Sequence, residues 1–196
     1  VVAWLYGRTL RRRLPAPRLD LNARIVLRVS LLLTLAGTVL LAALEWQRAL
    51  GHLAPAERGL HAFFQSATCR TAGFNSVDVT ALGPAALFLM VILMFIGGAP
   101  GSTAGGVKVT AVAVIWANLR AVGRGSARVR LSDREISGVQ IGRALLVLSA
   151  GLALAAVAIL VLLVLEDRPV LPTVFEVFSA LGTVGLSLGL TPELGS

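Results

Sequence analysis

The chain has 196 residues, of which 56% are hydrophobic and 14% charged, and its formal net charge is +8. Soluble domains carry about 25% charged residues, so this composition excludes a soluble monomer, and its apolar character excludes a disordered chain. The single cysteine excludes an internal disulfide framework, and the sequence has no Cys and His cluster at metal-ligand spacing.

The basic residues stand between long apolar runs. Nucleic-acid binding needs a basic face on a folded soluble domain, so the sequence predicts no nucleic-acid partner. It predicts instead an all-α polytopic membrane protein. The chain begins at Val1 with what resembles the tail of an earlier segment, and we expect it to be a piece of a longer protein.

The first half of the chain predicts an arm, a span and a hairpin. Residues 1–24 predict a cytoplasmic basic arm, and residues 25–47 a spanning helix, since roughly 30 Å of hydrocarbon needs about 20 helical residues. Residues 61–75, and later 173–187, each combine an amphipathic half-helix with a turn of small residues. Both segments are too short to cross the membrane and return as helices, so we expect re-entrant hairpins.

The apolar stretch 82–119 is too long for one straight span and is interrupted at residues 97–106 by GGAPGSTAGG. Unpaired backbone groups in lipid cost several kcal/mol each, so such a break must be buried in protein or line a wet cavity. One alternative is helix packing, because Gly97, Gly101 and Gly105 have the spacing of a close helix contact. Pro100 and the additional glycines disfavour a continuous helix.

A basic loop at residues 123–142 precedes a second predicted span at residues 143–165. Of the 18 Lys and Arg residues, seven lie in 8–28 and six in 120–143, whereas four lie in segments expected on the other side. The positive-inside rule therefore places both basic segments in the cytoplasm.

The same unit occurs twice in the chain. The turn TAGFN at residues 71–75 aligns with TVGLS at residues 183–187 at an offset of 112, and the preceding spans align at an offset of 118. We therefore expect one complete span–hairpin–span repeat at residues 25–122. The first span and hairpin of a second repeat follow at residues 143–196, related to the first by an axis along the membrane normal.

The Thr-x-Gly turns carry the candidate chemistry. A dehydrated alkali cation needs oxygens in place of its water, and main-chain carbonyls of an extended segment supply them. Gly73 and Gly185 permit backbone conformations that a side chain would block. The half-helices end just before these turns, so their negative dipole ends point to where a cation would wait.

Three segments resemble a known family: FQSATCRTAGFNSVDV (64–79), FIGGAPGSTAGGVK (95–108) and ALGTVGLSLG (180–189). They are similar to the Trk/Ktr/HKT superfamily of potassium transporters, and most closely to the Ktr-type membrane subunit. The resemblance covers nearly the whole chain. It implies a pore of four such repeats around a pseudo-fourfold axis, of which this chain would supply the third and the start of the fourth.

The resemblance also implies a function, K⁺ transport across the cell membrane with Na⁺ as a possible coupling ion, and no enzymatic activity. The two turns would be selectivity-filter strands that present backbone carbonyls to K⁺, and residues 97–106 would form a gating loop beneath them. The implied filter residues are Thr71, Ala72, Gly73, Phe74, Asn75, Thr183, Val184, Gly185, Leu186 and Ser187. The implied gate residues are Gly97, Gly98, Gly101, Ser102, Thr103, Gly105, Gly106 and Lys108, whose charge would repel resting cations.

The implied partners are membrane lipid, the rest of the pore-forming chain, a second copy in a homodimer, and a cytosolic ring of nucleotide-binding regulatory subunits. One alternative is a non-conducting helix-packing or assembly module. A second is an intramembrane serine hydrolase built on Ser102 with His52 or His61, although the sequence departs from the G-x-S-x-G spacing.

Two charged residues near the turns have more than one interpretation. Arg70 either anchors the first turn, through outer-loop carbonyls or Asp78, or faces solvent at a pore mouth. Glu176 either attracts cations or accepts backbone N–H bonds near the first turn of its helix, and we favour the second interpretation.

Overall fold

The computed structural model describes residues 20–126, 128–132, 134–166 and 168–189, so the basic arm expected at residues 1–24 lies almost wholly outside the described residues. The chain is mostly helical, as expected. Its elements in order are α2 (Leu21–Glu45), α3 (Pro55–Thr68), the short 3-10 helix η1 (Val79–Ala81), α4 (Pro84–Phe95), α5 (Val109–Gly123), β1 (Arg130–Leu131), β2 (Arg134–Glu135), α6 (Gly138–Glu166) and α7 (Val170–Leu181).

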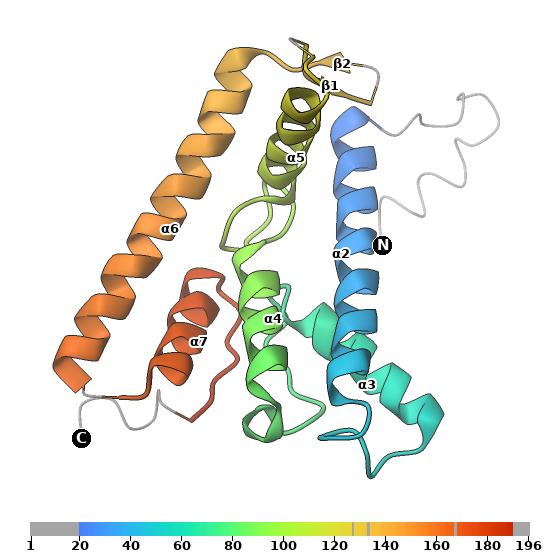
Figure 1. The fold of residues 1–196 in the computed structure, drawn as a ribbon, viewed down its shortest axis with the longest axis vertical. Coiled ribbons are helices and arrows are strands. Elements are labelled where there is room, and N and C mark those ends of the chain that lie inside the picture. The colour runs from blue at the N-terminus through green and yellow to red at the C-terminus, as the bar shows by residue number, and fades with distance from the viewer. Residues whose placement is uncertain (1–19, 127, 133, 167, 190–196) are drawn as a thin grey trace, which may run out of the picture.

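Two long apolar helices run along the long axis of the molecule (Figure 1). Among the described residues, α2 with 25 residues and α6 with 29 are the helices long and apolar enough to cross a membrane. Their large side chains point outward: Leu32 is 68% exposed and Val164 is 76% exposed. Exposing apolar surface to water costs about 25 cal/mol per Å², whereas lipid tails are as apolar as leucine. These surfaces therefore suit a hydrocarbon environment.

The two half-length helices α3 and α7 lie in the same half of the molecule, toward the C-terminal ends of α2 and α6 (Figure 1). Helix α3 packs on α2, and α7 packs on α4 and α6. Helix α3 begins at Pro55, six residues before the expected segment. Proline suits a first helical turn because it has no N–H to leave unpaired, and the Glu57 carboxylate accepts from the backbone N–H of Ala54 at 3.0 Å.

The core of this half lies around α4, where Met90 and Met94 are fully buried together with Phe175 of α7. Helix α4 is apolar on nearly every side, as expected of a helix enclosed by neighbours. Its N-terminus is fixed by the buried Glu45, whose Oε1 accepts from the N–H of Gly83 at 2.9 Å. This carboxylate joins the end of α2 to the start of α4.

The helix stops at Phe95 and resumes at Val109, so the apolar stretch 82–119 is two helices, α4 and α5, joined by an irregular segment. Figure 1 shows them stacked end to end between α2 and α6. Because the segment between them is not helical, the interpretation of Gly97, Gly101 and Gly105 as one helical packing face is wrong.

The basic loop at residues 123–142 contains a feature that the sequence did not predict. Strands β1 and β2 pair antiparallel, with Arg130 opposite Glu135 and Leu131 opposite Arg134. Strands of two residues are too short to carry a recognisable alternation of apolar and polar residues. This hairpin lies at the opposite end of the molecule from α3 and α7 (Figure 1).

Candidate functional site

Each Thr-x-Gly turn follows the end of a half-length helix and has an unusual backbone. In the first turn, φ is +74° at Thr71 and +73° at Gly73; in the second, φ is +53° at Thr183 and +88° at Gly185. A positive φ costs a residue with a Cβ roughly 1–2 kcal/mol, so a threonine that adopts it twice at equivalent positions indicates a constraint common to both turns.

The backbone alternates in hand along each turn, because the residues that follow the threonine and the glycine do not have positive φ. The same pattern of φ therefore occurs at equivalent positions of both turns.

The two turns lie against each other although they are 112 residues apart in the chain. A Cβ built on Gly73 would lie well inside 3.0 Å of the main-chain oxygen of Val184, 3.4 Å from the Val184 carbonyl carbon and 3.7 Å from the Gly185 Cα. Conversely, a Cβ on Gly185 would lie 3.9 Å from the Gly73 Cα. The closest approach between the turns thus depends on the absence of a side chain at Gly73.

A polar side chain from the preceding helix braces the far end of each turn. Thr68 Oγ1 donates to the carbonyl oxygen of Phe74 at 2.7 Å and accepts from the Phe74 N–H at 2.9 Å. In the second turn, Glu176 Oε1 accepts from Ser187 Oγ at 2.5 Å and from the Leu188 N–H at 2.9 Å. Glu176 therefore holds the end of the second turn through Ser187 and Leu188, contacts that the sequence did not predict.

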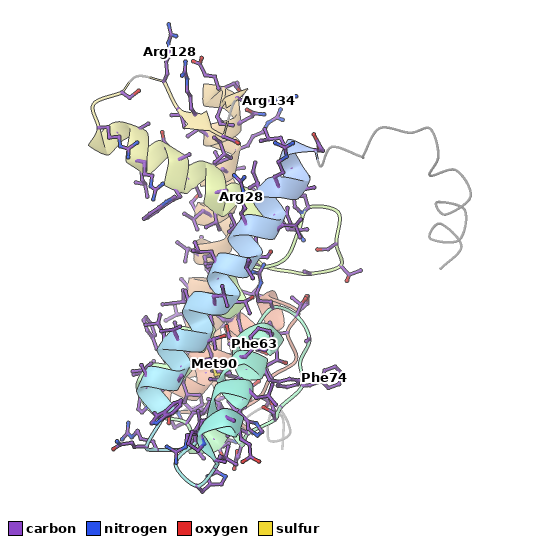
Figure 2. The ribbon with its side chains drawn as sticks, turned by 90° about the vertical axis from the view of Figure 1, so that its right-hand side faces the viewer. Arg28, Phe63, Phe74, Met90, Arg128 and Arg134 are labelled. Atoms are coloured by element: carbon purple, nitrogen blue, oxygen red, sulfur yellow. The ribbon has the colours of Figure 1, made fainter. Side chains whose placement is uncertain are left out.

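The side chains of the two turns have different surroundings. Val184 and Leu186 are buried, at 3% and 2% exposure. Phe74 is 69% exposed and projects from the molecule in Figure 2. Of the remaining residues of the two turns, Ala72, Asn75, Thr183 and Gly185 are exposed, and Thr71, Gly73 and Ser187 are partly exposed.

The glycine-rich segment between α4 and α5 forms a closed loop. Its ends pair as an isolated parallel bridge between Ile96 and Val107. The Gly97 N–H donates to the Val107 oxygen, and the Val107 N–H donates to the Phe95 oxygen, both at 2.9 Å. The Lys108 ammonium folds back onto the loop and donates to the carbonyl oxygen of Ala104. Backbone groups at the neck of the break are thereby paired within the protein.

This loop contacts the second turn directly, and it contacts Arg70, the residue before the first turn. At its start, the Gly97 oxygen accepts from Arg70 at 3.2 Å. At its end, the Gly105 N–H donates to Thr183 Oγ1 at 2.8 Å, and the Gly106 N–H donates to the Leu181 oxygen at 3.1 Å. A Cβ on Gly105 would lie 2.5 Å from the Leu181 oxygen, so this approach also requires glycine.

Arg70 joins three parts of the chain. Besides Gly97, its guanidinium donates to the oxygen of Ser30 at 3.1 Å and to Ser30 Oγ at 3.2 Å, both on α2. Both expectations for Arg70 are wrong: it contacts neither outer-loop carbonyls nor Asp78, and it is half-buried rather than solvent-facing. Sequence reasoning missed these partners because they lie 27 and 40 residues away.

The remaining candidate chemistry is weak. The hydroxyl of Ser102 donates to the carbonyl oxygen of Ala99 at 2.6 Å, within its own turn. Among the described residues, no group of three or more His, Cys, Asp or Glu is placed to hold a metal ion. The chemically distinctive feature is therefore the pair of turns that meet between the two repeats.

Comparison with known proteins shows a family of cation transport proteins. The family described as TrkH, cation transport protein, matches residues 1–196. The chain is 39% identical over 182 residues to the potassium/sodium uptake protein NtpJ of Enterococcus hirae. The aligned region covers 90% of this chain and 40% of that protein.

Two further relatives are named as components of a Ktr system. The chain is 38% identical over 177 residues to the Ktr system potassium uptake protein B of Bacillus subtilis, covering 89% of this chain and 40% of that protein. It is 38% identical over 178 residues to the protein of the same name from Vibrio alginolyticus, covering 90% and 39%. The chain thus spans about 40% of the length of these relatives.

Proposed function

This chain belongs to the TrkH family of cation transport proteins, and on that premise we propose that its two Thr-x-Gly turns supply main-chain carbonyls to a potassium pathway through the membrane. The family consists of transporters and not of enzymes. The expectations of a Trk/Ktr relationship and of a transport protein are thereby confirmed, and the hydrolase alternative is dropped.

The observation that carries the proposal is the meeting of the two turns. Gly73 and Gly185 come from repeats 112 residues apart, yet their Cα atoms lie close enough for a Cβ on one to touch the other. Both turns have the same alternation of backbone hand. Equivalent turns that meet at one place bring main-chain carbonyls of both repeats together, and such carbonyls can coordinate a bare cation from several sides.

The loop at residues 97–106 is proposed as the gate of this pathway. Its support is the set of contacts with Arg70 at one end and with Thr183 and Leu181 at the other. A loop held by a few hydrogen bonds can change position at a cost of a few kcal/mol. The Lys108 ammonium, held on the loop, would repel a cation resting there.

The membrane arrangement follows from the helices and the charges. We propose that α2, α6 and the α4–α5 pair cross the bilayer and that α3 and α7 re-enter from the outer side. Arg128 and Arg134 lie at the other end of the molecule in Figure 2, with Arg28 in the same half, and by the positive-inside rule this end would face the cytoplasm. The half-helices then end in mid-membrane, where their negative dipole ends favour a cation.

The ions and partners are proposed from the family. K⁺ is the transported ion, as in the names of the relatives, and Na⁺ as a second ion rests on the name of NtpJ alone. Repeats equivalent to the two described here would complete the pore. A homodimer and a cytosolic ring of nucleotide-binding subunits are proposed from the resemblance to Ktr-type subunits.

Replacement of Gly185 by valine in the intact transporter tests the proposal. The control is Gly189→Val, because both glycines have φ +88° and no described residue has an atom within 4 Å of a Cβ added to Gly189. Uptake of Rb⁺ and Na⁺ is measured in cells that lack other potassium uptake systems. We expect Gly185→Val alone to change the Rb⁺/Na⁺ ratio. Unchanged selectivity in a correctly assembled Gly185→Val protein would contradict the filter role.

A further inference from the structure

A hollow of about 720 Å³ opens at the C-terminal end of α5, on the side away from the turns. Its walls come from the last turns of α5, the following loop and strand β1. Four arginines line it, Arg120, Arg124, Arg128 and Arg130, together with Trp116, Ser126 and Ser132. We call this the basic hollow; Arg128 marks the end of the molecule on which it lies in Figure 2.

The charge of the basic hollow exceeds what the end of α5 requires. Basic side chains near a helix C-terminus complement its dipole, which accounts for Arg120 and Arg124. The last carbonyls of α5 are already paired, since the Ser126 N–H donates to the Ala121 oxygen at 2.9 Å. Arg128 and Arg130 belong to the next segment and bring two further guanidinium groups to the same place.

Glu135 lies opposite Arg130 in the β1–β2 hairpin but is not among the residues that line the hollow. Within the ranges that the structure describes, no carboxylate lines it, and none of the four side chains donates a hydrogen bond to a protein acceptor. Four like charges around one space repel each other. An anion that receives their hydrogen bonds would relieve this repulsion, and guanidinium forks match the geometry of phosphate oxygens.

The surface beside the basic hollow is apolar. On α5, Trp116 is 57% exposed and Leu119 is 58% exposed, and Arg120 lies 5.1 Å from the centre of the Trp116 ring. Tryptophan is enriched where a membrane protein passes from hydrocarbon to headgroups. An anion with an attached apolar chain can therefore contact both the arginines and this flank, whereas a free anion contacts the arginines alone.

We propose that the basic hollow binds the phosphate headgroup of an anionic phospholipid, whose acyl chain lies along Trp116 and Leu119. Anionic lipids are abundant in the cytoplasmic leaflet and attract basic segments, and this end carries most of the arginines outside the proposed pore. The proposal does not depend on the role of the turns.

Lipid binding to the intact protein in detergent tests the proposal. Native mass spectrometry measures retention of phosphatidylglycerol and of phosphatidylcholine with the same acyl chains. The variant is Arg128→Gln with Arg130→Gln, both at exposed side chains. The matched control is Arg24→Gln with Arg28→Gln, which removes the same charge on α2 at the same end.

We expect the wild type to prefer phosphatidylglycerol. The Arg128/Arg130 variant should bind it about 25-fold more weakly, because each basic residue near a membrane surface contributes about fivefold in affinity. The Arg24/Arg28 control should keep wild-type affinity, and thermal unfolding confirms that both variants fold. Equal weakening in the two variants would instead indicate a general surface charge effect and overturn the proposal.

Two further measurements separate the possible sources of the anion. If inorganic phosphate binds with the same dependence on Arg128 and Arg130 and phosphatidylglycerol does not displace it, the site takes a free anion and the lipid proposal fails. If the Arg128/Arg130 variant keeps its lipid and instead loses an acidic protein partner, the surface is a protein-docking surface and the proposal also fails. Displacement of phosphate by phosphatidylglycerol supports it.

Discussion

The contact between the turns predicts a difference between two glycine-to-alanine substitutions. Gly73→Ala introduces a Cβ at a φ of +73° and places it well inside 3.0 Å of the Val184 oxygen. Gly185→Ala introduces a Cβ at a φ of +88°, but its nearest neighbour outside the turn is the Gly73 Cα at 3.9 Å. Both variants carry the backbone strain, and only the first carries the clash.

The magnitudes follow from these two terms. A positive φ at alanine costs roughly 1–2 kcal/mol, and forcing an extra methyl into a packed place costs about 1–3 kcal/mol. We therefore expect Gly185→Ala to destabilise the paired turns by about 1–2 kcal/mol. Gly73→Ala should destabilise them by about 2–5 kcal/mol, since the atom it meets is backbone and cannot rotate away.

The assay combines stability and transport in the intact transporter. Thermal unfolding in detergent measures the first, and Rb⁺ and Na⁺ uptake in cells lacking other potassium uptake systems measures the second. Gly73→Ala should lower the unfolding temperature and the Rb⁺/Na⁺ ratio more than Gly185→Ala does. Equal effects of the two substitutions on both quantities would refute the close approach of the turns on which the reasoning depends.

Three other changes test the surroundings of the turns. Gly105→Ala places its Cβ 2.5 Å from the Leu181 oxygen and should displace the glycine loop and raise K⁺ flux. Gly101→Ala, whose Cβ would have no described neighbour within 4 Å, should change flux little. Equal flux in the two variants would contradict a gating contact. Arg70→Gln should lower the free energy of unfolding by about 2 kcal/mol, since the hydrogen bonds of Arg70 are charge-assisted. It should also alter gating, which single-channel or uptake recordings measure. A Gln variant with wild-type stability and flux would argue against the bridge to Gly97. Hydrogen bonds from the Thr80 side chain and backbone lower the pKa of Asp78 from its usual 3.8, so the stability advantage of the wild type over Asp78→Ala should be full above pH 3.8 and be lost as the pH falls through the lowered pKa; unfolding temperatures from about pH 6 to about pH 3 check this, and an advantage that grows in acid would contradict it.

Sequence periodicity and composition predicted the long helices and the interruption between them. The apolar runs in α2 and α6 are long and nearly free of charge, and that pattern has few structural solutions. The break at residues 97–106 was predictable because proline and repeated glycines both oppose a helix. The start of α3 at Pro55 lies before the expected segment, although proline followed by Glu57 is typical of a helix N-terminus.

The contacts of the candidate site were not predictable in the same way. The sequence identified the Thr-x-Gly turns by their repetition, and the structure places them together. The partners of Arg70 and Glu176 depend on how distant segments pack, and local patterns carry no information about them. The roles of the turns as a filter and of the loop as a gate remain predictions. The sequence accounts for the arginines at residues 120–134 by membrane orientation and general contact with anionic lipid, and it gives no sign that four of them line one hollow.

The separation of the two turns along the chain has a consequence for synthesis. At roughly 5–20 residues per second, a ribosome needs about 6 to 22 s to make the 112 residues from Gly73 to Gly185. During that interval the first turn cannot contact the second, which has not yet been made. Its hydrogen bonds to Thr68 are already available within the newly made segment. The nascent chain can therefore hold the first turn in its final conformation before the second turn is synthesised.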